Sequence, residues 1–484
     1  MFRKSLNTEI KNDRESCARN SAIWFIACNY ILKGVSLITI PVFTRLLVPQ
    51  EYGLLAELTA AEEILLMISN WDIFSGAYLK GLYKFEDVKF FTSVSQMFAN
   101  VTALCLYLVL MAVFWVYGSG YIFTPVSFLA MFMNHLFYPG YRFWLIRRQS
   151  EFAYRPAAAA AFAYGLLMSL IPFCTVLFVR RTAQVKFCTA LFVSALFSVP
   201  FYIKNVRFIS LWKNREQLRE EFQFILKYQF PFLLSSLSLV LLTQLDRIMI
   251  GRTEGHEQTA YYGVACSLIS GLTVLYASAG QAFLPWKYEK LKAKDYNAVK
   301  NIEGKLMIAA ALAAVMFISI APEAVRLLFP DSYHEAALCI PALAAGAFFN
   351  YGSSFFASLE TYYEKTKYSA IGMIICSGMN ILLNFLLIDY FGYIVCAYTT
   401  AFSYFVYMVL HSIFARMTIR EAGLESGIYH KWLMILTCFA LVLAAGVFLW
   451  LYPYPFIRYG LAGIFIVVLI CRKSGRGDIK WKSM

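Results

Sequence analysis

The sequence has few charged residues for its length. Asp, Glu, Lys and Arg make up 15% of its 484 residues, whereas a water-soluble domain usually carries about 25%. Hydrophobic residues make up 60% of the chain, and the charges gather between long apolar runs. This distribution indicates that lipid is the solvent for most of the chain.

Several kinds of functional motif are missing. The eleven cysteines lie mostly in apolar runs and include no CxxC pair, so we expect neither a metal site nor a disulfide framework. The sequence has no nucleotide-binding loop, no DxD motif and no long outer loop, so we expect no ATP hydrolysis, no enzyme activity and no cofactor. Residues 1–20 lack the features of a secretory signal, so we expect the first apolar run to be kept as a membrane helix.

What the chain does have is a series of about fourteen apolar segments, each close to the roughly 20 residues that span a bilayer. We expect an all-α integral membrane protein with these transmembrane helices. The predicted spans are 21–43, 53–75, 93–117, 119–141, 156–179, 187–203, 228–250, 262–285, 305–328, 336–359, 368–390, 392–415, 431–451 and 454–471.

The distribution of Lys and Arg residues predicts the orientation of these spans in the membrane. With the N-terminus inside, the inward segments carry about four times as many of them as the outward segments, as the positive-inside rule requires. We therefore expect a multi-pass protein of the bacterial inner membrane with both termini in the cytoplasm. Topology and anionic lipid account for the net charge of +14, and nucleic-acid binding is not expected.

The spans suggest an organisation in two halves. A cytoplasmic tail (1–20) precedes spans one to six (21–204), a cytoplasmic amphipathic connector (205–227) and spans seven to twelve (228–415). The last two spans (416–471) and a basic tail (472–484) follow. Residues 41–64 and 241–269 are weakly similar, with Arg45 and Arg247 in matching places, and such repeats are common in transporters.

Three charged residues fall near the middle of predicted spans. Lys33, Glu62 and Glu63 lie roughly 15 Å deep, where an isolated charge costs about 2.5–3.5 kcal/mol or more. We expect them to face protein or a wet cavity. One hypothesis is that Lys33 meets a substrate phosphate while a glutamate, with Glu63 favoured, takes up a proton; the alternative is a buried ion pair that locks two helices.

His135 and Arg142 share a stripe with Tyr138 on the fourth span. Arginine binds phosphate in a bidentate way, so Arg142 is a candidate phosphate contact. The alternative is that Arg142 snorkels to the membrane interface as a topology charge. For His135 alone, helix packing is the better interpretation.

Two further pairs are weaker candidates. Asp246 and Arg247 end the seventh span, where they could gate the outer mouth or anchor the helix at the interface. Asn380 and Asn384 share a face of the eleventh span, where they could contact sugars or make interhelical hydrogen bonds.

Four segments resemble bacterial polysaccharide flippases of the Wzx type, within the multidrug/oligosaccharidyl-lipid/polysaccharide exporter superfamily. They are PVFTRLLVPQEYG (41–53), SLVLLTQLDRIMIG (238–251) with AYYGVACSLI (260–269), LLFPDSYHEAALCIPAL (327–343) and NILLNFLLIDYFGYIVCAYTTAFSY (380–404). Residues 394–397, Ile-Val-Cys-Ala, depart from the glycine- and alanine-rich pattern of that family. The resemblance implies two six-helix lobes around a central cavity plus two C-terminal helices.

The resemblance also implies alternating access for a polyprenyl-pyrophosphate-linked oligosaccharide in the biosynthesis of a surface polysaccharide such as O-antigen. Expected partners are this lipid-linked substrate, membrane lipids, H⁺ or Na⁺, a polysaccharide polymerase and a chain-length regulator. An ion-coupled multidrug exporter and a flippase for another precursor, such as lipid II, are the alternatives.

Overall fold

A computed structural model describes residues 34, 39–117, 122–151, 153–206, 212, 214–423, 428–461 and 463. Within this part of the chain every regular element is helical, so the expected all-α class is confirmed. Ten of the helices are long and apolar enough to cross a membrane. The chain divides into two compact units, Met1–Ala260 and Tyr261–Met484.

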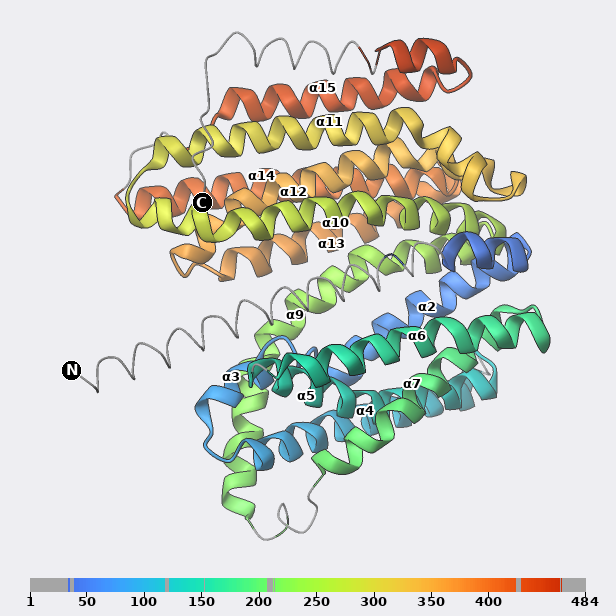
Figure 1. The fold of residues 1–484 in the computed structure, drawn as a ribbon, viewed down its shortest axis with the longest axis vertical. Coiled ribbons are helices and arrows are strands. Elements are labelled where there is room, and N and C mark those ends of the chain that lie inside the picture. Colours follow the sequence, from blue (N-terminus) through green and yellow to red (C-terminus); the bar gives the residue numbers. More distant parts are fainter. Residues whose placement is uncertain are drawn as a thin grey trace. The chain divides into compact units, whose positions relative to one another are not determined.

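Besides the helical residues 39–46 and the first residues of α10, the described part of the first unit contains six long helices and one short helix (Figure 1). They are α2 (Pro49–Asn70), α3 (Ala77–Lys84), α4 (Val88–Tyr117), α5 (Pro125–Ser150), α6 (Tyr154–Phe178), α7 (Ala183–Asn205) and α9 (Arg215–Thr253). An aromatic core fixes the end of this unit around α3, where the stacked rings of Tyr78 and Phe91 and the ring of Phe143 are fully buried.

The second unit takes up most of α10 and the helices that follow it. They are α10 (His256–Lys292), α11 (Tyr296–Leu328), the 3₁₀ helix η1 (Asp331–Cys339), α12 (Ile340–Tyr362), α13 (Lys367–Phe391), α14 (Ile394–Glu421) and α15 (Lys431–Trp450). Helix α12 is mostly buried, and it packs on α11, α14 and α15. Gly346 lets α12 approach α14 closely, since a Cβ there would lie 3.2 Å from the Ala401 backbone, a packing mode common between membrane helices.

Each predicted span from the second to the thirteenth coincides with a described helix. Most of the first and last predicted spans lies outside the described residues. Helices α2 and α5 are long enough to cross a membrane but are less apolar than the ten candidate spans. Buried glutamate, asparagine and histidine side chains lower their hydropathy, and these side chains form the candidate site described below.

The structure differs from the sequence prediction at the connector and at the boundary between the two halves. We expected 205–227 to form a separate surface helix, but from Arg215 onwards it continues into the next span as one helix of 39 residues. Residues 207–211 and 213 lie outside the described part. The two compact units divide inside α10, beyond this connector, because α9 packs against α2, α3 and α4 of the first unit.

Candidate functional site

Three glutamates of α2 point to three different neighbours. Glu57, Glu62 and Glu63 lie on one helix, and successive residues of a helix are turned by about 100°. Glu62 therefore faces α5, Glu63 faces α9, and Glu57 faces the residues around the start of α10. Because the three environments differ in burial and in partner, the three carboxylates are suited to different tasks.

Glu62 contacts polar side chains of α5. The Asn134 side-chain amide donates a hydrogen bond of 3.0 Å to Glu62 Oε1. His135 Nε2 lies 3.5 Å from the same oxygen, and His135 Nδ1 lies 3.3 Å from the Tyr107 hydroxyl. His135 is fully buried, and 10% of the Glu62 side chain stays exposed. A carboxylate beside an imidazole at such depth can bind or pass on a proton.

An aromatic wall continues from this cluster along α5 and α6. Tyr141 stacks on Tyr164 with ring centroids 5.0 Å apart, and the Tyr164 hydroxyl lies 3.1 Å from Ser194 Oγ. Arg142 lies beside the Tyr138 hydroxyl, and its guanidinium group lies 5.4 Å from the centre of the Phe74 ring. Tyr141 is only 3% exposed, so the rings of this wall pack largely on one another, and the wall also contains hydroxyl groups and one cation.

Glu63 belongs to a second polar face, shared by α2 and α9. The Gln244 side-chain amide donates a 2.5 Å hydrogen bond to Glu63 Oε2, and Arg247 Nη1 donates a 2.6 Å hydrogen bond to Gln244 Oε1. Glu63 is exposed within the described structure. Because a charge against acyl chains costs several kcal/mol, this face of α2 is expected to border water rather than lipid. Asp246, next to Arg247, is buried in α9.

Glu57 forms a third cluster that our sequence analysis missed. His256 Nδ1 lies 2.5 Å from Glu57 Oε1, and the Thr259 hydroxyl donates to the same oxygen at 3.3 Å. Glu57 is 1% exposed. Gly53 permits the close approach, since a Cβ there would lie 1.6 Å from the His256 carbonyl oxygen. The available signal was the weak similarity of residues 41–64 and 241–269, which contain Gly53 and His256, but nothing in it indicated His256 as the partner.

In the second unit, Asn380 and Asn384 hold α13 against α14. The Asn380 amide donates a 3.1 Å hydrogen bond to the Thr400 hydroxyl, and the Thr399 hydroxyl donates to the Asn384 carbonyl oxygen. Both asparagines are fully buried. These contacts favour the interhelical interpretation of the pair over contact with a sugar.

The second unit also contains a buried ion pair and a buried His–Glu contact that the sequence analysis did not find. Lys287 Nζ lies 2.6 Å from Glu303 Oε1 and donates to the Phe355 carbonyl oxygen at 2.6 Å. His411 Nδ1 lies 2.8 Å from Glu360 Oε1, and both side chains are fully buried. We had counted Lys287 as a cytoplasmic loop charge, so only a knowledge of helix packing could have identified it.

The remaining predicted site residue, Lys33, lies outside the described residues. The structure therefore brings together Glu62 with His135, and Glu63 with Arg247 through Gln244, and it places Arg142 on α5, seven residues after His135. In the part of the chain that is described, no group of His, Cys, Asp and Glu side chains is arranged to hold a metal ion.

The described residues form an all-helical bundle with ten helices long and apolar enough to cross a membrane, which is the architecture of a multi-pass membrane protein. Fold comparison agrees: the lipid II flippase MurJ, in its inward closed conformation, matches with a TM-score of 0.64 over 94% of this chain and 100% of that chain, at 14% identity. The Vibrio cholerae MATE transporter VcmN matches with a TM-score of 0.53 over 84% of this chain and 98% of that chain, at 11% identity.

The chain belongs to the polysaccharide biosynthesis protein family, whose sequence profile matches residues 18–289. An uncharacterized membrane protein of Methanocaldococcus jannaschii is 26% identical over 238 residues, which cover 48% of this chain and 44% of that protein. The chain thus matches less than half the length of this relative. The similarity to the family agrees with the superfamily that the four sequence segments indicated.

Proposed function

We propose that this protein carries a polyprenyl-pyrophosphate-linked oligosaccharide across the bacterial inner membrane by alternating access. Membership of the polysaccharide biosynthesis family and the flippase-like fold support transport of this class. The observation that carries the proposal is the Glu62 cluster with its aromatic wall. Aromatic faces and hydroxyl groups suit sugars. A pocket for cationic drugs would not carry an arginine at its edge, because the two positive charges repel each other.

Arg142 is the described residue best suited to the pyrophosphate. It lies on α5, seven residues after His135, with its guanidinium group near the ring of Phe74 and the hydroxyl of Tyr138. A guanidinium group can donate two parallel hydrogen bonds to a phosphate, and it keeps its charge in an apolar setting. Lys33 and Arg247 remain candidates for further contacts with the phosphates.

The carboxylates of the cluster are the proposed binding site for the coupling ion. In this proposal Glu62 exchanges a proton with the compartment that the site faces, while Glu63 contributes from the second polar face. Sodium is the other candidate ion, because carboxylate and amide oxygens are ligands that hard cations prefer. A surface polysaccharide polymerase and a chain-length regulator are the expected partners on the product side.

The test is transport by the purified full-length protein in liposomes. A fluorescent polyprenyl-pyrophosphate oligosaccharide is placed in both leaflets, and its accessibility to a membrane-impermeant quencher is followed. We expect Arg142→Ala to slow transport by about tenfold or more, the loss typical of a charge-assisted hydrogen bond. Arg148→Ala is the matched control, because Arg148 lies on the same helix but pairs with Glu151. Equal rates for both variants would contradict the assignment of Arg142.

Multidrug export is the second candidate, favoured by the carboxylates of α2 and the MATE-like fold. The same liposomes distinguish it, since an exporter of this kind would move a cationic dye such as ethidium against its gradient and leave the labelled oligosaccharide in place. Labelled lipid II provides a third arm. Transport of lipid II alone would keep the flippase class and replace the substrate.

A further inference from the structure

A groove on the second unit is lined by residues other than the predicted site residues. It runs between α12, α14 and α15 and has a volume of about 680 Å³, within the range of roughly 300–1,000 Å³ that is usual for ligand sites. Apolar side chains make up most of its lining, among them Phe349, Phe405, Met408, Met434 and Val442. None of these side chains can interact with an anion, so this part of the groove fits hydrocarbon.

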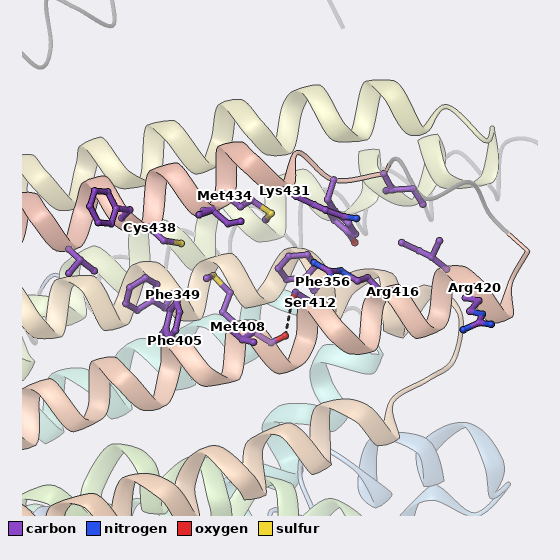
Figure 2. Close-up of a pocket in the computed structure, with 17 residues that line it drawn as sticks. Phe349, Phe356, Phe405, Met408, Ser412, Arg416, Arg420, Lys431, Met434 and Cys438 are labelled. Carbon is purple, nitrogen blue, oxygen red and sulfur yellow. Dashed lines mark hydrogen bonds between the residues drawn. The ribbon is translucent and has the colours of Figure 1, made fainter.

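The charged residues of the lining lie at one end of the groove and are all cations. Figure 2 shows Arg416, Arg420 and Lys431 on one side of the view, and the rings of Phe349 and Phe405 on the other. The three cations are exposed, and among the described residues no carboxylate lines the groove. They come from two helices, the end of α14 and the start of α15.

This arrangement matches a molecule with a negative head and a long apolar tail. The segment 416–430 is predicted to face the cytoplasm, where the leaflet of the membrane carries anionic lipids. We propose that the groove binds one anionic glycerophospholipid of this leaflet, with an acyl chain along Phe405 and Met434 and its phosphate between Arg416 and Lys431. The ligand is a membrane lipid rather than the transported substrate, so the site is separate from the proposed transport route.

A lipid bound in this way has a structural consequence. Its acyl chain lies against both α14 and α15, while Tyr429 in the lining packs on Phe356 of α12 with ring centroids 4.8 Å apart. The Tyr429 hydroxyl also donates a 3.4 Å hydrogen bond to the Phe355 carbonyl oxygen. The lipid would therefore stabilise the packing of α15 on the rest of the second unit.

Native mass spectrometry of the full-length protein tests the proposal. The protein is purified in a mild detergent and titrated with dioleoyl phosphatidylglycerol or, separately, with dioleoyl phosphatidylethanolamine. We expect one tightly bound phosphatidylglycerol and at least about tenfold weaker binding of the zwitterionic lipid. The variant R416Q/R420Q/K431Q should lose this preference.

Two control variants keep the test independent of folding. K292Q/K294Q/K305Q removes three exposed cations that lie outside the groove, and it should keep the preference for phosphatidylglycerol. Val442→Trp should fill the apolar part of the groove and weaken binding, whereas Val447→Trp, at an exposed position of α15 outside the lining, should not.

The proposal would be overturned by equal loss in both triple variants, by equal binding of the two lipids, or by retention of a polyprenyl phosphate instead of a glycerophospholipid. The last outcome would make the groove part of the substrate route. A crosslink from Cys438, which lines the groove, to a C-terminal segment of the same chain would show that the protein covers the groove itself, and it would overturn the proposal as well.

Discussion

The buried carboxylates of the two units differ in what surrounds them. In the second unit, Glu303 and Glu360 each face a cationic or protonatable partner within 2.8 Å, and these four side chains are at most 3% exposed. In the first unit, Glu62 faces an amide at 3.0 Å and an imidazole at 3.5 Å, and its side chain keeps 10% of its surface exposed.

This difference is the basis on which we propose a transport role for Glu62 and a structural role for the buried pairs of the second unit. A fully buried ion pair that also binds backbone groups has no room for a ligand, and removing one partner leaves an uncompensated charge. A carboxylate that accepts from an amide and keeps part of its surface exposed can change its protonation at less cost to the fold. In this account the burial of the carboxylate, and not the unit to which it belongs, separates the two roles. Glu57 lies in the first unit but is 1% exposed and pairs closely with His256, so it is grouped with the structural carboxylates.

The largest effect on stability is expected where the ion pair is most buried. Lys287→Met leaves Glu303 without its cation, and we expect a loss of about 3–5 kcal/mol in the free energy of unfolding. Thermal unfolding of the detergent-solubilised protein, followed by tryptophan fluorescence, measures the loss. The double variant K287M/E303M should recover most of it, because two apolar side chains replace two charges.

The matched control is Lys290→Met on the same helix. Lys290 pairs with Asp295 at 3.3 Å, and both side chains are more than a third exposed, so its removal should cost less than about 1 kcal/mol. Loss of transport in a stable K287M/E303M protein would assign this pair to the transport cycle. It would contradict the structural role that the comparison of the two units gives to the pair.

The next largest loss of stability is expected at the contact between α2 and the backbone of His256. In Gly53→Ala, the new Cβ would meet the His256 carbonyl oxygen and push α2 away from the start of α10. We expect the free energy of unfolding to fall by about 1–3 kcal/mol. Gly378→Ala in α13 is the control, because a Cβ there meets nothing within 4 Å. Equal unfolding temperatures for the two variants would show that the Glu57 cluster tolerates movement.

The sequence predicted the helices well and their contacts poorly, for physical reasons. Apolar runs of about 20 residues follow from the thickness of the membrane, so span limits such as 431–451 came close to α15. The long α9 was not predicted, since a charged segment such as 215–227 reads as a surface helix although nothing in it ends a helix. The angle between Glu62 and Glu63 was predictable from helix geometry, whereas their partners Asn134 and Gln244 depend on tertiary packing.

A smaller effect on stability should depend on pH, and the residue that causes it lies outside the predicted membrane spans. Glu221 lies in the charged first part of α9, before the predicted span 228–250. Burial raises the pKa of its carboxyl to about 7, against a hydrogen bond from Gln217 that lowers it. Since the folded state holds this proton more tightly than the unfolded state, stability is greatest below pH 4.5 and falls as the pH rises towards 7.

Glu221→Gln should remove this dependence, so the variant should be about 1–2 kcal/mol more stable than the parent at pH 8 and no more stable at pH 4. Unfolding measured across this range at constant salt checks the sign. Glu220→Gln is the control, because Glu220 is exposed. A parent stability that rises between pH 4.5 and 7 while Glu221→Gln stays flat would contradict this account of Glu221.

The smallest effect on stability is expected at Glu62, the residue with the largest expected effect on transport. Gln keeps the oxygen that accepts from Asn134, so Glu62→Gln should change the free energy of unfolding by less than about 1 kcal/mol. The exposed Glu86→Gln is the control for the loss of one negative charge.

The most direct measurement is the transport rate of Glu62→Gln in liposomes, taken at matched unfolding temperature and with an imposed pH gradient. If Glu62 carries the coupling proton, the rate should fall at least about tenfold and lose its dependence on the gradient, while Glu86→Gln keeps both. A full, gradient-dependent rate in Glu62→Gln would contradict the central claim.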